Sequence, residues 1–122
     1  MLVRDKYRGT SEYAKARAEL VRIAQAKRLI TYKDLARVAG LPLVGNNMAR
    51  EVGSVLGAIS EDEVVAGRPM LSAVAVNAHG YAGTGFFGLA RSLGRLSKTQ
   101  DEDAFWEAER DAVYEAWAET GD

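Results

Sequence analysis

Residues 46–59, NNMAREVGSVLGAI, constrain the fold of this chain more than any other segment. Their apolar residues recur every three or four positions, which predicts a helix with one face toward a core. This apolar face comprises Met48, Val52, Val55, Leu56 and Ile59. The opposite face carries Asn46, Arg50, Gly53, Ser54 and Gly57. Because each glycine inside a helix costs about 0.5–1 kcal/mol relative to alanine, this thin face predicts the close approach of another backbone.

The length of 122 residues favours one domain, residues 1–122, with a single core. A content of 48% hydrophobic and 27% charged residues is typical of a soluble globular protein. With no cysteine, the chain has no disulfide, thiolate nucleophile or cysteine metal site. We find no apolar run of membrane-spanning length and no apolar signal-peptide centre, so we expect a cytoplasmic protein without membrane contact.

The net charge of −1 conceals an asymmetry between the two halves of the chain. Residues 1–60 contain 11 Lys and Arg against 5 Asp and Glu, whereas residues 61–122 contain 5 against 12. A basic half can face phosphates while an acidic half faces solvent or a protein partner. Mutual attraction of the two halves within the fold explains the same pattern equally well.

The segment before residue 46 predicts two helices. Apolar positions spaced by three or four residues predict the first helix over about 11–28. Thr31, followed three residues later by Asp34, is a capping pattern that opens a short helix over 32–39, and Gly40 marks its end. Together with the helix over 46–59, this short helix forms a helix-turn-helix candidate.

The segment after residue 59 predicts a wing. Ser60 with Glu63 repeats the capping pattern and predicts a separate helical turn up to residue 65. Residues 70–76 are rich in Val, Leu and Ala and predict a strand, followed by a turn over 77–80 and a very short returning strand. A β-hairpin after a helix-turn-helix is the order of a winged helix.

Two further helices are expected in the C-terminal part. Residues 85–93 have helical apolar spacing and are followed by Gly94. Thr99 and Glu102 form a capping pattern for a last helix to about residue 119. The expected fold is therefore mainly α with a small β-hairpin: a winged helix-turn-helix-like core over 10–83 and a C-terminal helical extension over 84–119.

Two strings in the first half resemble a known family. ITYKDLARVAGLP (30–42) and AREVGSVL (49–56) are similar, in the same order, to segments of the DNA-binding domain of alkylguanine-DNA alkyltransferases and alkyltransferase-like proteins. VNAHG (76–80) resembles the segment after the active-site strand of that family. The resemblance implies a winged-helix fold that binds double-stranded DNA.

The resemblance also implies roles for individual residues. Tyr32 matches a tyrosine that presses on the phosphate of the target nucleotide, and Arg50 matches an arginine finger that enters the duplex. Gly53 matches a glycine of the helix that lies in the minor groove. A cation inserted into a narrow groove benefits independently from its negative potential.

The catalytic motif of that family is missing. Counting back from Asn77 places Ser72 at the position of the family's cysteine, and the neighbouring histidine and arginine are absent. A serine hydroxyl is a poor nucleophile without a base, and the single histidine, His79, lies in the expected turn. We therefore predict no catalytic residue, no metal and no cofactor, with Ser72 as the residue to examine for a remaining pocket.

The sequence thus predicts a non-catalytic protein that binds double-stranded DNA through the helix over 46–59. The predicted contacts are Tyr32, Lys33, Asn46, Asn47, Arg50, Gly53 and Ser54. A protein–protein interaction module, such as a small regulatory adaptor, is the alternative, because a helix pair packed through Gly53 and Gly57 needs the same small residues. The acidic C-terminal half is a second candidate surface for a protein partner or self-association.

Overall fold

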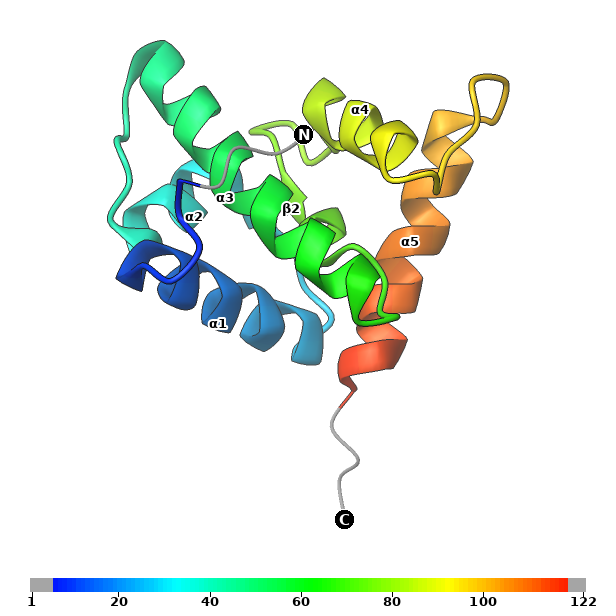
Figure 1. The fold of residues 1–122 in the computed structure, drawn as a ribbon, viewed down its shortest axis with the longest axis horizontal. Coiled ribbons are helices and arrows are strands. Elements are labelled where there is room, and N and C mark those ends of the chain that lie inside the picture. The colour runs from blue at the N-terminus through cyan, green and yellow to red at the C-terminus, as the bar shows by residue number, and fades with distance from the viewer. Residues whose placement is uncertain (1–5, 119–122) are drawn as a thin grey trace.

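The protein is built mainly from helices, as its sequence predicts. The computed structural model describes residues 6–118, apart from the side chain of Asn46 (Figure 1). In chain order its elements are α1 (Ser11–Gln25), β1 (Ile30–Thr31), α2 (Tyr32–Ala39), α3 (Gly45–Val65), the 3-10 helix η1 (Leu71–Val74), β2 (Ala75–Val76), α4 (Thr84–Ser92) and α5 (Glu102–Trp117). None of the helices in the described range is long and apolar enough to cross a membrane.

Helix α3 is the central element. Figure 1 shows it running across the molecule, with α1 and α2 to one side and α4 and α5 to the other. The expected interruption at Ser60 is wrong, because one helix of 21 residues continues to Val65. Ser60 is fully buried and its hydroxyl bonds to Ser72 rather than capping a new helix. Burial therefore overrode a local capping pattern.

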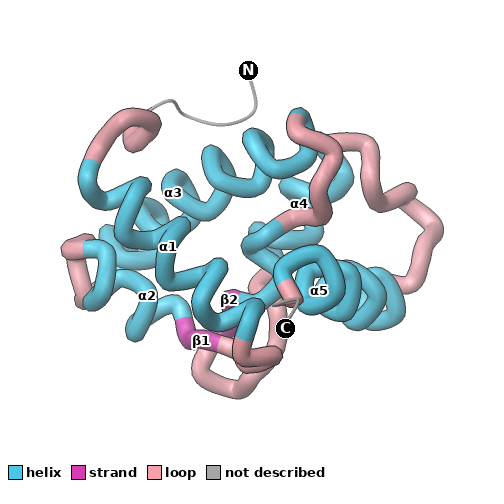
Figure 2. The backbone as a smooth tube through the Cα atoms, turned by 90° about the horizontal axis from the view of Figure 1, so that it is seen from below, coloured by secondary structure: helices cyan, strands magenta, loops and turns pink. Residues whose placement is uncertain are grey.

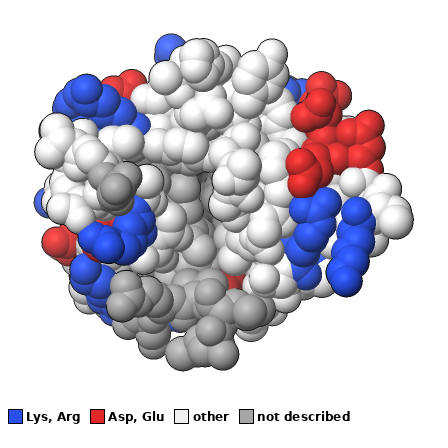
Figure 3. All heavy atoms as spheres, turned by 90° about the horizontal axis from the view of Figure 1, so that it is seen from above, with Lys and Arg blue, Asp and Glu red and all other residues white. Residues whose placement is uncertain are grey.

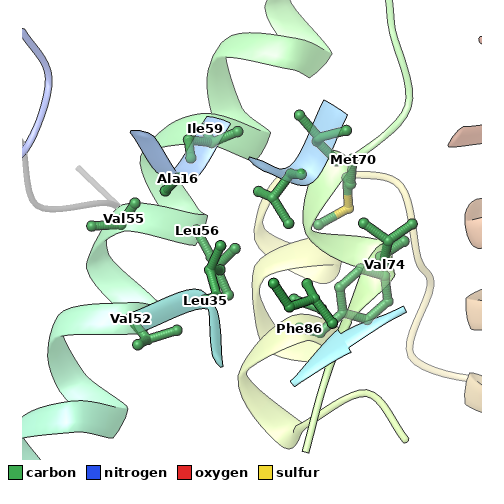
Figure 4. Close-up of a cluster of buried hydrophobic side chains, with 14 of the residues drawn as sticks. Ala16, Leu35, Val52, Val55, Leu56, Ile59, Met70, Val74 and Phe86 are labelled. Atoms are coloured by element: carbon green, nitrogen blue, oxygen red, sulfur yellow. The ribbon is translucent and has the colours of Figure 1, made fainter. Parts of the chain in front are cut away.

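The apolar stripe of α3 forms the middle of the core. Val52, Val55, Leu56 and Ile59 are buried as predicted, while Met48 is only half-buried. In Figure 4 the four buried side chains of α3 face side chains from α1, from α2, from the segment that contains η1 and from α4. The labelled residues of these segments are Ala16, Leu35, Met70, Val74 and Phe86. Burying one such side chain contributes about 1.5–3 kcal/mol, so this stripe fixes which face of α3 turns outward.

The expected β-hairpin is absent from the described structure. Residues 70–76 are all buried, and most of the segment forms η1 instead of a strand. Only β2 is extended, and it pairs in parallel with β1, with Ile30 opposite Ala75 and Thr31 opposite Val76 (Figure 2). A short buried helical turn satisfies part of its own backbone, through Ala73 N–H bonding to the Met70 carbonyl at 3.0 Å. The winged-helix assignment consequently remains a prediction.

Helix boundaries agree with the local signals in α2 and deviate elsewhere. The Thr31 side chain accepts a hydrogen bond from Asp34 N–H at 3.1 Å, and Gly40 ends α2 with a φ of 82°. Helix α1 ends at Gln25 rather than residue 28, because Lys27 takes a positive φ of 55°. Asp101, not Thr99, caps α5, which ends at Trp117; residue 119 lies outside the described residues.

Ion pairs connect the basic and acidic halves at one place in the described structure. Acids in the last two turns of α3 pair with cations at and before α1, and the shortest distances are Arg8–Glu61 2.5 Å, Arg8–Asp62 3.0 Å and Arg17–Glu63 3.1 Å. The paired acids of α5 find cations within their own half, in Arg91–Glu102, Arg95–Glu109 and Arg110–Asp111. Among the described residues, no ion pair joins the acidic half to the first turns of α3, where Arg50 pairs only weakly with its neighbour Glu51.

Candidate functional site

A groove of about 720 Å³ lies between α3 and α4. Figure 3 shows this face of the molecule hollowed near its middle, with Lys and Arg side chains on the flank to the left of the hollow. One wall comes from α3 with Arg50, Gly53, Ser54 and Gly57, and the other from α4 with Gly85, Gly88, Leu89 and Ser92. Among the described residues that line the groove, Arg50 alone is charged. A cavity of this size, mostly apolar with few polar groups, is typical of a binding site.

The thin face of α3 is open along part of its length. Gly53 is exposed, and a Cβ added there would meet nothing within 4 Å. Ser54 is half-buried, and its hydroxyl donates to the Arg50 carbonyl at 3.1 Å, which keeps it within the helix. Gly57, in contrast, is buried. The predicted exposed face is therefore correct around Arg50 and Gly53 and wrong at Gly57, where α3 passes into the core.

Arg50 projects from this open face. Its side chain is 59% exposed, and its Nη2 donates to Oδ1 of Asn47, one helical turn earlier. Its Nε lies 3.8 Å from Glu51 Oε2, a long distance for an ion pair, so this contact is weak. Because a guanidinium carries five N–H donors, most of them remain for a ligand at the mouth of the groove. The side chain of Asn46 lies outside the described structure, so its predicted contact is untested.

Tyr32 lines the groove at the start of α2 and is half-buried. Its hydroxyl oxygen accepts a hydrogen bond from Gly83 N–H at 2.8 Å. Burial raises the pKa of Tyr32, although the Gly83 bond opposes this, so the hydroxyl keeps its proton and can donate to an acceptor. A Cβ at Gly83 would lie 3.0 Å from that hydroxyl, which explains the glycine. The next residue, Lys33, is exposed.

Ser72 lies on the floor of the groove and is 4% exposed. Its hydroxyl accepts a hydrogen bond from Ser60 Oγ at 2.7 Å, and its backbone N–H donates to the same oxygen at 3.1 Å. The single histidine, His79, is exposed in the turn over 77–80, where its N–H donates to Asn77. A serine bonded to a second serine gains no basic partner, so Ser72 is not activated as a nucleophile by this contact. Within residues 6–118, no group of His, Asp and Glu could hold a metal ion.

Some residues at this site carry no evident signal in the sequence. Glu51 is 9% exposed, and its carboxylate accepts hydrogen bonds from Lys6 and Tyr7, which are more than 40 positions away. No local pattern relates such distant positions. The second wall has a weak signal, because Gly85 and Gly88 stand three residues apart, a spacing that places small residues on one helix face.

Comparisons with models of protein families, with curated proteins and with solved structures found no match to this chain.

Proposed function

We propose that the protein binds double-stranded DNA without catalysing a reaction, with the open face of α3 against the duplex. The observation that carries this proposal is the position of Arg50, a 59% exposed cation on a helix face where Gly53 has no neighbour within 4 Å. A duplex backbone needs this combination of close approach and positive charge. The resemblance of residues 30–42 and 49–56 to an alkyltransferase DNA-binding domain supports the same function.

The surroundings of Arg50 are consistent with this role. A guanidinium binds phosphate oxygens or base edges through paired N–H donors. The hydrogen-bond partner of Arg50 within α3, Asn47, is uncharged and therefore does not neutralise the Arg50 guanidinium. Tyr32 and Lys33 at the start of α2 supply a hydroxyl donor and a second cation for the phosphates. In this arrangement the groove leaves room beside Arg50 for the edge of the duplex.

The alternative is a protein-interaction module that dimerises through Gly53 and Gly57. Gly57 is buried within the chain, so these two glycines do not form one exposed contact surface. A dimer would depend on Gly53 and its exposed neighbours, or on the exposed acids of α5. No specific observation favours such an assembly over DNA.

Titration of a fluorescent DNA duplex, followed by anisotropy, tests the proposal. We expect affinity to fall steeply between about 50 and 200 mM salt, because binding releases counterions from phosphates. Replacing Arg50→Ala is expected to cost about 1–3 kcal/mol of binding free energy. Arg22→Ala is the matched control, because Arg22 is 64% exposed on α1 and outside the groove, and it should leave affinity unchanged.

Two results would contradict the proposal. The first is an absence of duplex binding by the wild-type protein at low salt. The second is an affinity that Arg50→Ala and Arg22→Ala change equally. Sedimentation analysis of the same samples covers the alternative, because a stable dimer that Gly53→Leu disrupts would favour the interaction module.

A further inference from the structure

The acid that follows Arg50 in the chain is held away from solvent. The Glu51 side chain is 11% exposed, in contrast to the 59% of Arg50. A buried carboxylate needs a cation or hydrogen-bond donors, because its desolvation is otherwise costly. Arg50 is one available cation. If its guanidinium paired closely with Glu51, it would bind any other anion more weakly.

The segment before α1 supplies the stronger contacts. Glu51 Oε1 accepts hydrogen bonds from Lys6 Nζ at 2.7 Å and from Tyr7 Oη, whereas Oε2 lies 3.8 Å from Arg50 Nε. These bonds from Lys6 and Tyr7 hold the pKa of Glu51 below its ordinary value, although burial opposes them. Glu51 is therefore charged at neutral pH, and most of that charge is matched by groups other than Arg50.

The two donors are fixed in place by the start of α1. Tyr7 is buried, and its carbonyl accepts hydrogen bonds from the N–H and hydroxyl of Thr10, the residue that caps α1. Lys6 Nζ lies 5.3 Å from the centre of the Tyr7 ring, within the range of a cation–π contact. The position of α1 on α3 thus determines which groups reach Glu51.

We propose that Glu51 is a positioning residue that sets the availability of Arg50 for DNA, and that Lys6 and Tyr7 keep Arg50 available by binding the Glu51 carboxylate. The expected change in DNA affinity rests on the proposed function. The expected change in the orientation of Arg50 rests only on the contacts of Glu51. When Lys6 is removed, Arg50 is the cation that remains beside this buried charge among residues 6–118. The guanidinium then turns from Asn47 and the groove toward Glu51.

Lys6→Met tests this coupling, because it removes the ammonium and keeps much of the side-chain length. We expect about a fivefold loss of affinity for duplex DNA, the upper range for one surface charge pair. Glu51→Gln alone should change affinity little, because Lys6 and Tyr7 already match the charge of Glu51 in the wild-type protein. Since Lys6 is 54% exposed, a direct phosphate contact would also weaken binding. The double variant Lys6→Met/Glu51→Gln separates a direct phosphate contact of Lys6 from redirection of Arg50. If Lys6 acts through Glu51, Lys6→Met should not lower DNA affinity further once Glu51 has been replaced.

Two further variants sharpen the test. Tyr7→Phe keeps the ring and removes the hydroxyl donor, so it should lower DNA affinity in the same direction as Lys6→Met. Lys15→Met removes an exposed cation from α1, outside the contacts of Glu51, and should leave affinity unchanged. An equal loss from Lys6→Met with and without Glu51 would overturn the inference and make Lys6 a phosphate contact.

A measurement without DNA distinguishes failure of this inference from failure of the proposed function. In nitrogen-15 NMR spectra, the Nε–H signal of Arg50 should shift between the wild-type protein and Lys6→Met, because the guanidinium pairs with Glu51. The same signal should not shift between Glu51→Gln and the double variant, because the acid is absent from both. A signal unchanged by Lys6→Met overturns the inference. Absence of duplex binding by the wild-type protein overturns the proposed function alone.

Discussion

Helix α3 holds one buried glutamate near each end, and the two are paired in different ways. Glu63 is 1% exposed and accepts hydrogen bonds from Arg17 and Arg68 on both of its oxygens. Glu51 accepts its bonds from Lys6 and Tyr7, and its neighbour Arg50 stays exposed. The C-terminal end of α3 therefore pairs its acids with cations of the same chain, whereas the N-terminal end leaves one cation available at the groove.

The partners of Glu63 are themselves part of a packed cluster. Both arginines lie over the ring of Trp117, at 5.3 Å and 5.5 Å from its centre. One aromatic ring at the end of α5 therefore holds the cations from α1 and from the loop after α3 beside the same carboxylate. Such an arrangement serves the fold, because each charged group is committed to a partner within the chain.

The largest expected effect comes from removing the cations of Glu63. Arg17→Met combined with Arg68→Met leaves the carboxylate buried without a counter-charge, and we expect a loss of about 3–5 kcal/mol in the free energy of unfolding. Urea denaturation at pH 7, followed by tryptophan fluorescence, measures it. Arg22→Met with Arg37→Met is the control, because those exposed pairs contribute little. A loss no larger than that of the control would show that Glu63 is not a stabilising anchor.

A smaller effect is expected from pH. Burial raises the pKa of Glu63, but hydrogen bonds from Arg68 and Arg17 outweigh it and hold the pKa below the ordinary 4.5. A carboxyl with a lower pKa in the folded state stabilises the fold above its unfolded pKa and loses that contribution as pH falls. The free energy of unfolding should therefore decline below about pH 4.5, less steeply in Glu63→Gln. Identical slopes in urea titrations from pH 7 to 3 would contradict this assignment.

The smallest expected effect concerns the open wall of the groove. Gly53→Ala should stabilise the fold by about 0.5–1 kcal/mol, because alanine favours the helix and its Cβ meets nothing within 4 Å. The same substitution should weaken DNA binding if the duplex approaches α3 closely. Gly88→Ala on α4, the opposite wall of the groove, also meets nothing within 4 Å and should stabilise the fold equally. It should weaken DNA binding less than Gly53→Ala, because the proposed contact is made by α3. Thermal unfolding and anisotropy measure both quantities, and an unchanged affinity for Gly53→Ala would argue against close approach.

Local signals predicted the parts of the fold that depend on near neighbours in the chain. Thr31, Asp34 and Gly40 bound α2 as expected, because a cap and a left-handed glycine act within a few residues. The apolar stripe of α3 was also predictable, since helical spacing alone places Val52, Val55 and Ile59 on one face. Among the site residues, the exposed positions of Arg50 and Gly53 follow from that same stripe.

Where residues far apart in the chain meet, the sequence was insufficient. The capping pattern at Ser60 was misleading because Ser72 and the surrounding core bury that hydroxyl. Most of the expected strand over 70–76 forms η1 instead, in a segment that is buried throughout. The same holds for the second wall of the groove and for the pairing of Glu51 with Lys6 and Tyr7. Local spacing in the sequence determined which face of α3 turns outward. Tertiary packing decided what lies opposite that face and which charges beside Arg50 are already paired. The reason is that burial and electrostatic pairing depend on distance in space rather than on distance along the chain.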